Sequence, residues 1–372
     1  MNLDAGAAGG VGRMAGIDLA RALAIIGMVT VHISPSGTDS SLAYVLALPR
    51  GRSAILFALL AGVGVSLLAA SRTTSTGQAR RTLLWRVVVL LPLGLWLQTL
   101  DHNVLVILAD YAVLFLVAIV LLTWSDRWLL MVAAGSAVLG GIGFRAGQLY
   151  VDDFERAAPE FGQPVLEIVQ ALVVSGPYPL ITWLAPLCVG MWLGRRDLRA
   201  AVVRRRLLQI GGAVGVLIPA VLVALDRLAG VPVPSSGWWP LLDDTPHSQR
   251  PLWLLSTIAA AAAILGLCLW LASVWPGPVR FLARSGQLAF TWYVAHLLVL
   301  HVNEDLLRTG SIAGTFTVIA IFAAVMAVVS ALWLAAVPRG PLEFVLRPPR
   351  RRTSSGTADD QRGVGDSPRS CS

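Results

Sequence analysis

The sequence contains no lysine, and charged residues of any kind are scarce. All 29 basic residues are arginine, and charged residues make up 13% of the 372 positions. Soluble domains usually carry about 25% charged residues, so this deficit argues against a soluble globular protein. The net charge is +8, but the arginines lie in short loops between apolar runs, which positive-inside topology explains. We therefore expect no nucleic-acid partner.

Signatures of several enzyme and metal sites are also missing. The three cysteines, Cys188, Cys268 and Cys371, share no loop, so no disulfide or zinc site is expected. There is no Walker loop, no Rossmann glycine fingerprint and no Gly-x-Ser-x-Gly elbow. The histidines lack metal-ligand spacing, so we expect no metal. No internal repeat marks a two-fold transporter.

What the chain has instead is apolar sequence, with 56% hydrophobic residues and a mean hydropathy of +0.72. Many apolar runs reach the length of about 17 residues that a membrane helix needs. They predict an all-α, polytopic membrane helix bundle of about ten transmembrane helices. The stretch 164–175 is apolar but too short to span, which favours a re-entrant or interfacial segment. The expected spans are 16–34, 53–71, 83–100, 104–123, 128–145, 178–194, 207–226, 252–275, 286–302 and 311–337.

The placement of the arginines predicts the orientation and the domain boundaries. With a cytoplasmic N-terminus, 21 arginines fall on the inner side, seven fall outside and Arg21 lies within the membrane. This excess predicts that both termini are cytoplasmic. We expect a cytoplasmic segment over 1–15, one transmembrane domain over 16–337, and a cytoplasmic tail over 338–372. The tail is rich in Arg, Ser, Gly and Asp, so we expect it to be disordered.

The first apolar helix carries an unusual polar stripe. In RMAGIDLARALAIIGMVTVHIS, residues 13–34, Asp18, Arg21 and His32 fall on nearly one side of a helix at ~100° per residue, with His32 roughly 16 Å above Arg21. Charges inside a bilayer are costly and indicate a function or a partner. Asp18 and Arg21 either pair with each other or place Arg21 against an anionic ligand, and the two interpretations are compatible.

Histidine and aspartate recur at similar depths on other predicted helices. His32 is either an ordinary interfacial residue or a group for acid–base chemistry or acyl transfer, since an unperturbed imidazole has a pKa near 6.5. Asp110 and His296 lie at a shared depth in the outer half of the membrane. An Asp110–His296 contact would orient the imidazole as in a catalytic triad. The alternative is polar contact between helices without chemistry.

The outer side holds most of the remaining polar candidates. Arg52 precedes the second predicted span on the side where arginine is rare, so it is a candidate for binding an anionic substrate. His102 and His247 lie in outer loops, and loops on a rigid scaffold often carry function. Tyr293 lies one turn before His296. Each of these residues also has an ordinary structural interpretation, as surface or interhelical polar residues.

The opening RMAGIDLARALAIIGMVTVHIS, followed by GRSAILFALLAGVGVSLL, resembles the heparan-α-glucosaminide N-acetyltransferase catalytic-domain family. The resemblance covers most of residues 13–337 and implies a bacterial plasma-membrane enzyme that uses acetyl-CoA. Asp18 and Arg21 match the family's Asp-x-x-Arg, which implies a donor-binding role. His32 falls where the lysosomal enzyme has asparagine and where related bacterial acyltransferases have histidine. Residues 35–49 contain no counterpart of the lysosomal enzyme's luminal catalytic histidine.

The leading hypothesis is therefore transfer of an acyl group, expected to be acetyl, from cytoplasmic acyl-CoA to an extracytoplasmic glycan or glycolipid. Arg21, supported by Asp18, would contact the donor. His32, or His296 oriented by Asp110, would act as base or acyl carrier. The expected acceptor-binding residues are Arg52, His102, His247 and Tyr293. The bilayer is the expected surrounding partner, and a homodimer is a compatible assembly. The alternatives are a transporter or lipid flippase, and a structural membrane protein without a ligand.

Overall fold

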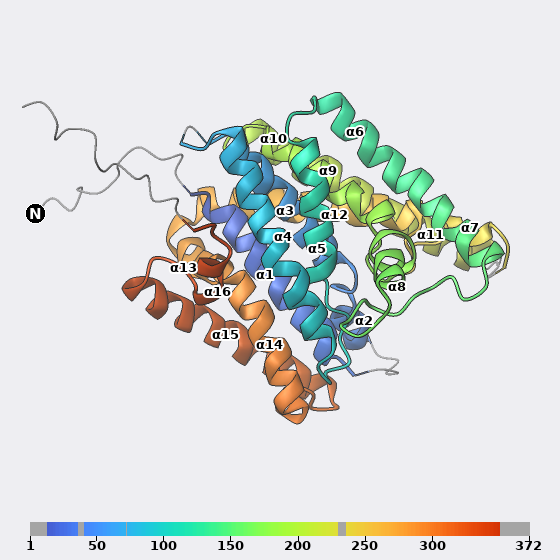
Figure 1. The fold of residues 1–372 in the computed structure, drawn as a ribbon. Helices are drawn as coiled ribbons and strands as arrows, with labels where there is room; N and C mark the ends of the chain where they lie inside the picture. The colour runs from blue at the N-terminus through green and yellow to red at the C-terminus, as the bar shows by residue number, and fades with distance from the viewer. Residues whose placement is uncertain (1–12, 36–40, 72, 230–235, 350–372) are drawn as a thin grey trace, which may run out of the picture.

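The computed structural model describes residues 13–35, 41–71, 73–229 and 236–349, and within these ranges all regular structure is helical (Figure 1). Short π-helical turns (η1, Ser136–Gly140; η2, Ala171–Ser175; η3, Leu207–Gly211) continue neighbouring helices, and η4 (Trp239–Leu242) and η5 (Glu304–Leu306) are 3-10 turns. The α-helices are α1 (Ala15–Ile33), α2 (Ser41–Ala47), α3 (Arg52–Ala69), α4 (Thr76–Gln98), α5 (Leu108–Leu121), α6 (Asp126–Gly135), α7 (Gly141–Tyr150), α8 (Val165–Gln170), α9 (Leu180–Gly194), α10 (Ala201–Arg206), α11 (Gly212–Ala229), α12 (Pro251–Val274), α13 (Pro276–Gln287), α14 (Ala289–Val302), α15 (Ile312–Ala336) and α16 (Pro341–Val345).

The prediction of an all-helical, polytopic fold is confirmed, but the structure supports fewer full spans than ten. Among the described residues, seven helical stretches are long and apolar enough to cross a membrane. An eighth would be Val165–Ser175 with Leu180–Gly194, two segments bent by 54° that form a broken span or a re-entrant loop. Each predicted span overlaps a helix, but α5 and α14 have only 14 residues each. A helix of that length measures about 21 Å, against a hydrocarbon core of about 30 Å.

The two short helices are short for local reasons. Residues 101–107 are irregular, so α5 begins at Leu108 and not at the predicted residue 104. Leu288 interrupts the stretch between α13 and α14, and the predicted span 286–302 therefore begins inside α13. Residues 104–107 and Leu288 are themselves apolar, so hydropathy alone assigns them to the predicted spans.

Helices α1, α3, α9 and α12 form the centre of the bundle, and α3 and α9 pack backbone against backbone. A methyl group on Gly62 of α3 would collide with the carbonyl oxygen of Leu187, and one on Gly190 of α9 with that of Leu59. Small residues at such positions allow membrane helices to approach closely. The glycines therefore fix the distance between α3 and α9.

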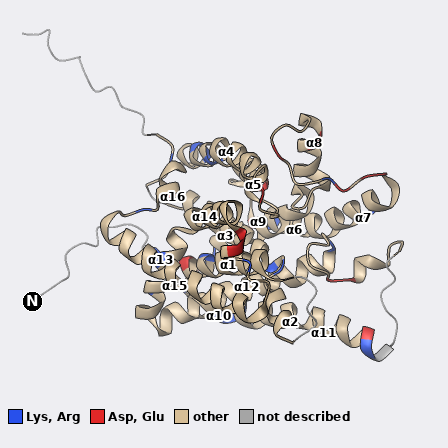
Figure 2. Ribbon diagram, turned by 90° about the horizontal axis from the view of Figure 1, so that it is seen from below, with Lys and Arg blue, Asp and Glu red and all other residues tan. Residues whose placement is uncertain are grey.

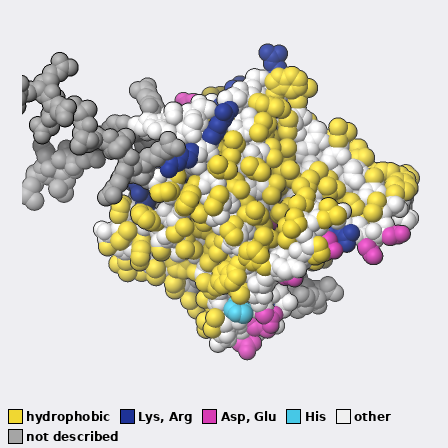
Figure 3. Space-filling model, viewed as in Figure 1, with side chains coloured by type: hydrophobic (Ala, Val, Ile, Leu, Met, Phe, Trp, Pro, Cys, Tyr) yellow, Lys and Arg dark blue, Asp and Glu magenta, His cyan; other side chains and the backbone are white. Residues whose placement is uncertain are grey.

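The outer surface is dominated by apolar side chains. Figure 3 shows a broad hydrophobic face, with most of the visible arginines toward one edge and histidine and acidic residues toward the other. In Figure 2 charged residues are few among the helices. Large exposed apolar residues recur on peripheral helices, for example Val88, Met131, Val216 and Leu332. This surface fits a lipid environment.

The chain returns to the bundle after α15, and this corrects the predicted tail. Trp85 Nε1 donates to the carbonyl oxygen of Val345 at 2.7 Å. The side chain of Glu343 accepts from the backbone N–H groups of Phe290 and Thr291 at 2.9 and 3.0 Å, and from the Thr291 hydroxyl. The prediction of disorder is therefore wrong for the start of the segment 338–372, and residues 350–372 lie outside the described part of the chain.

Candidate active site

Asp18 lies at the N-terminal end of α1, which we call the arginine end of the bundle. Its carboxylate is buried and accepts from Arg13 Nε at 2.5 Å and from Arg21 Nη1 at 2.8 Å. The predicted Asp18–Arg21 ion pair is confirmed. Arg13 is a second partner that the sequence analysis did not identify. Two guanidinium groups on one carboxylate leave a net positive charge at this end.

A cavity of about 250 Å³ opens beside this ion pair, and we call it the arginine-end cavity. Arg13, Arg21 and Arg86 contribute guanidinium groups to its lining. Nε of Arg86 is buried without a hydrogen-bond partner, and its guanidinium lies 5.7 Å from the centre of the Phe115 ring. Each arginine has five N–H donors, so the three present more donors than Asp18 accepts. The rest of the lining is mainly apolar and includes Phe57, Leu60, Leu90, Leu108, Tyr111 and Phe290.

His32 lies in the last turn of α1, at the opposite end, which we call the histidine end. Its Nδ1 is 3.0 Å from Nε2 of His296 on α14, and the two imidazole rings are stacked with an interplanar angle of 11°. His296 is buried, whereas His32 is only partly buried. The structure thus brings together the two histidines that the sequence offered as alternatives.

The hydrogen bonds of His296 determine which nitrogen of each ring carries the proton. Nδ1 of His296 is 3.2 Å from the carbonyl oxygen of Trp292, which can only accept, so this nitrogen is protonated. In a neutral His296 the other nitrogen, Nε2, then accepts from Nδ1–H of His32. This assignment follows from the hydrogen-bond network of the two rings. It leaves Nε2 of His32 unprotonated and free to take a proton.

The predicted contact between Asp110 and His296 is wrong. Both ring nitrogens of His296 are occupied by His32 and Trp292. Asp110 is buried in the first turn of α5, and neither of its carboxylate oxygens has a hydrogen-bond partner among the described residues. Asp110 and His296 were predicted to lie at the same depth in the membrane. Equal depth does not make two side chains face each other, because it says nothing of their direction around the helix axes.

His102 is a structural residue, contrary to its predicted place in the acceptor site. The ring is buried, Nδ1 accepts from the backbone N–H of Val104 at 3.1 Å, and Nε2 lies 2.9 Å from the carbonyl oxygen of Leu97. Because both nitrogens are used, none remains for a ligand. Burial lowers the pKa of His102 below its usual value. Arg308 adds to this network, since it donates to the carbonyl oxygens of His102 and His32 at 2.8 and 3.2 Å.

Three neighbouring cavities meet at the histidine end, with volumes of about 580, 400 and 30 Å³. His247 and Leu105 line all three, and His32 lines the largest and the smallest. Tyr293 lines the smallest cavity and its hydroxyl accepts from the backbone N–H of Ile107 at 3.2 Å. The structure therefore places three of the predicted residues, His32, His247 and Tyr293, around one cavity.

His247 reaches this position from the loop between α11 and α12. Its ring contacts those of Tyr178 and Trp253, with centroid distances of 5.8 and 5.9 Å. Two residues later, Gln249 is buried and bonds to Thr182 Oγ1 and Trp183 Nε1 at 2.8 and 3.0 Å, which anchors the loop on α9. Burial, and secondarily the charge of Arg50, lowers the pKa of His247 to about 4. The ring is therefore neutral at pH 7 and able to accept or donate a hydrogen bond.

Arg52 does not join this group. Its Nη1 donates to the carbonyl oxygen of Leu48, one turn back along the chain, at 3.1 Å, and its side chain lines none of the four cavities described above. The role predicted for Arg52 in acceptor binding therefore has no support from its position.

Among the described residues, no group of three or more His, Cys, Asp or Glu side chains is placed to hold a metal ion.

Several residues of the site were not predicted from the sequence. Arg86 carried the same signal as Arg21, a charge within an apolar helix, but it was counted with the loop arginines that set the orientation. Tyr178 and Arg308 carried no distinctive pattern, since their roles depend on where loops fold against the bundle. The missed residues are Arg13, Arg86, Tyr178 and Arg308.

Comparison with known families gives two matches that overlap. A family model described as "Heparan-alpha-glucosaminide N-acetyltransferase, catalytic" matches residues 13–222, more than half of the chain. A second, described as "Protein of unknown function (DUF418)", matches residues 193–349. No curated protein matches the chain. His32 lies in the first matched segment and His296 in the second, so their hydrogen bond joins the two.

Proposed function

Because the chain belongs to the heparan-alpha-glucosaminide N-acetyltransferase catalytic family, we propose that it is a membrane acyltransferase. It takes an acyl group, by preference acetyl, from acyl-CoA at the arginine end and delivers it to a hydroxyl or amine at the histidine end. The acceptor is a glycan or glycolipid outside the cytoplasm. The observation that carries the proposal is that α1 holds an arginine-lined cavity at one end and an imidazole-lined cavity at the other.

The arginine end suits the donor. Coenzyme A carries phosphate groups, and guanidinium groups bind phosphate through paired hydrogen bonds. Arg13, Arg21 and Arg86 supply such groups, and Asp18 orients two of them. The apolar inner part of the cavity suits the acyl group. Since the excess of arginine predicts a cytoplasmic arginine end, we place both termini in the cytoplasm and the protein in the bacterial plasma membrane.

The histidine end supplies the base. The acceptor's O–H or N–H proton passes to the free Nε2 of His32, and the acceptor's oxygen or nitrogen bonds to the acyl carbon. The C–S bond to coenzyme A breaks, and the thiolate takes the proton back from His32. His296 accepts from Nδ1–H throughout and stabilises the transient imidazolium, as the carboxylate does in a catalytic triad. In an alternative route, the same free nitrogen of His32 attacks the acyl carbon and forms a covalent acyl-histidine. This route differs from direct transfer because labelled acetyl-CoA would leave its label on the enzyme.

The test is acyl transfer in proteoliposomes supplied with labelled acetyl-CoA. We expect His32→Ala to lower the transfer rate by about 100- to 10,000-fold, the usual contribution of a positioned acid–base group. The matched control is His301→Ala, because His301 is exposed at the end of the same helix that carries His296. Unchanged transfer by His32→Ala would rule out the catalytic role of His32.

One observation favours a second function, that of a transporter or lipid flippase. The bend of 54° between Val165–Ser175 and Leu180–Gly194 resembles the discontinuous helices that line transport sites. Flux of a glycolipid through proteoliposomes without coenzyme A would support this function. Binding of acetyl-CoA that is lost in Arg21→Ala would favour the acyltransferase.

A further inference from the structure

The cavities of the two ends approach each other inside the bundle. On α3, Phe57 lines the arginine-end cavity and Ala54 lines the small cavity of about 30 Å³ at the histidine end. On α14, Phe290 lines the arginine-end cavity and Tyr293 lines the small cavity. Residues three apart on a helix are separated by about 4.5 Å along its axis. A layer roughly one side chain thick therefore separates the two spaces.

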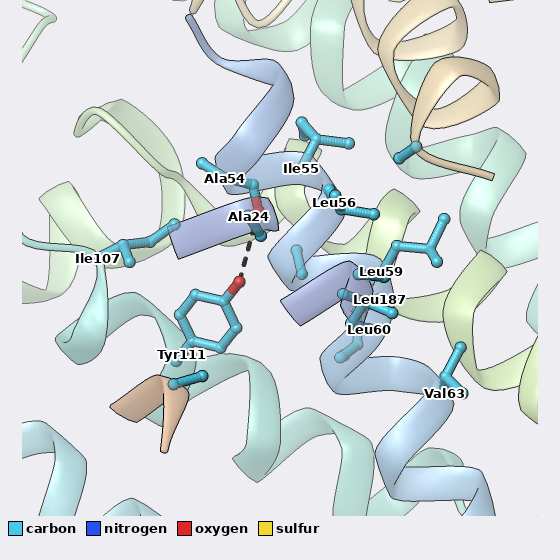
Figure 4. Close-up of a cluster of buried hydrophobic side chains, with 14 of the residues drawn as sticks. Ala24, Ala54, Ile55, Leu56, Leu59, Leu60, Val63, Ile107, Tyr111 and Leu187 are labelled. Carbon is cyan, nitrogen blue, oxygen red and sulfur yellow. Dashed lines mark hydrogen bonds between the residues drawn. The ribbon is translucent and has the colours of Figure 1, made fainter. Parts of the chain in front are cut away.

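The ring of Tyr111 occupies this layer. Tyr111 lies on α5, is buried, and lines the arginine-end cavity. Its hydroxyl points across to the carbonyl oxygen of Ala54, 3.5 Å away (Figure 4). Ala54 belongs to the lining of the small cavity, so the tyrosine reaches from the wall of one space to the wall of the other. Its ring packs edge-on against Phe57 at 5.6 Å.

The hydroxyl of Tyr111 is weakly held. A hydrogen bond between hydroxyl and carbonyl oxygen is normally 2.5–3.0 Å long, and buried tyrosine hydroxyls usually find a good partner. A contact of 3.5 Å restrains the side chain little. A phenylalanine would fill the same space, so the ring of Tyr111, and not its hydroxyl, is the group that occupies the layer.

We propose that Tyr111 is the partition between the donor and acceptor cavities and that its ring sets the longest acyl group that the protein accepts. The inference rests on the proposed function, because an acyl group must reach the acceptor at His32 from the arginine-end cavity, and it does so when the weakly held ring turns aside. A short acyl group ends at the tyrosine ring, with its carbonyl carbon next to the layer. A longer chain collides with the ring. While the ring is in place, water from the histidine end does not reach the thioester.

The partition can be tested without any acyl transfer. Ser53 is buried and lines the small cavity, so Ser53→Cys places a thiol on the far side of Tyr111. In sealed vesicles with the arginine end outward, a membrane-impermeant thiol reagent should leave this cysteine unmodified. Adding Tyr111→Ala should make modification at least roughly tenfold faster, since thiol reactivity follows access. Tyr111→Phe keeps the ring and should behave like the parent.

Equal modification rates in the Ser53→Cys parent and in its Tyr111→Ala derivative would overturn the partition. The same reaction on protein without Ser53→Cys measures the contribution of the natural cysteines, of which Cys188 and Cys268 are buried. If Tyr111→Ala does not yield folded protein, Tyr111→Leu removes the ring while keeping an apolar side chain of intermediate size, and the same outcomes apply.

The length limit is tested by comparing acetyl-, butyryl- and hexanoyl-CoA as donors. Tyr111→Ala should raise the kcat/KM of hexanoyl-CoA relative to acetyl-CoA by roughly tenfold or more, the usual effect of opening an apolar pocket by several methylene groups. Tyr111→Phe should keep the wild-type profile. Tyr150→Ala removes an exposed tyrosine from α7 and is the matched control. An unaltered donor profile in Tyr111→Ala would contradict the length limit. Absence of transfer in every protein, including the wild type, would contradict the proposed function. In that case the thiol test alone would decide whether Tyr111 is a partition.

Discussion

At the scale of single residues, the stacked pair of His32 and His296 assigns a different role to each imidazole. His296 holds and orients the ring of His32. His296 donates to the Trp292 carbonyl and accepts from His32, so its role is to keep one proton on Nδ1 of His32. The pair replaces the carboxylate–imidazole contact expected from the sequence. An imidazole acceptor avoids placing a further negative charge in the bilayer, where ionised carboxylates are costly.

This assignment leads to different outcomes for two substitutions at one position. His296→Gln keeps an oxygen that can accept from His32, whereas His296→Leu removes the acceptor. We expect His296→Leu to lower kcat by about 100-fold, and His296→Gln to retain most of the rate. Nitrogen NMR of histidine-labelled protein in nanodiscs should show the Nδ1–H form of His32 in the wild type and in His296→Gln. An equal loss of rate in both variants would mean that His296 itself must take the proton.

Residue partners were the hardest feature to predict from the sequence. Helical periodicity placed Asp18 and Arg21 on one face, and their ion pair followed directly because both lie on a single helix. The surroundings of Asp110 depend on the rotation of neighbouring helices, and the partners of His102 depend on the path of residues 101–107. Hydropathy gives the depth of a residue but not its direction around the helix axis.

At the scale of helices, glycine sets the geometry of the core. We expect Gly62→Ala to destabilise the protein by about 1–3 kcal/mol, as overpacking of a tight contact does, because the new methyl group meets the Leu187 carbonyl. Gly143→Ala on α7 is the matched control, since a methyl group there meets nothing within 4 Å. Alanine favours a helix over glycine, so this control should unfold at the wild-type temperature or slightly above. The measurement is thermal unfolding in detergent, and an unshifted midpoint for Gly62→Ala would contradict the close contact.

The positions of helices were predictable because long apolar runs leave the chain few alternatives in a bilayer. All predicted spans overlap helices, whereas their interruptions were not foreseen. Leu288 is itself apolar but separates two helices, and π-helical turns such as Leu207–Gly211 leave no hydropathy signal. Local breaks are decided by packing against neighbours, which a single sequence does not contain.

At the scale of the whole molecule, the two ends of the bundle differ in chemistry, and this polarity defines a topology. Asp152 follows α7 at the histidine end, and Ser273 lies near the end of α12 at the arginine end; both are exposed. On intact bacterial cells, an impermeant thiol reagent should label Asp152→Cys but not Ser273→Cys, and both should be labelled after permeabilisation. Labelling of Ser273→Cys alone on intact cells would reverse the orientation and place the donor site on the wrong side for coenzyme A.

The hydrogen bonds of Glu343 to the first turn of α14 have a practical consequence for the choice of protein boundaries in purification. Glu343 also lines the arginine-end cavity, so trimming the chain back to the end of α15, a common step before crystallisation, would remove part of a pocket wall. Such a shortened protein would be a poor sample for ligand screening even if it purified well. Affinity tags and fusion partners are better joined beyond residue 349, where the described contacts with α4 and α14 are left intact.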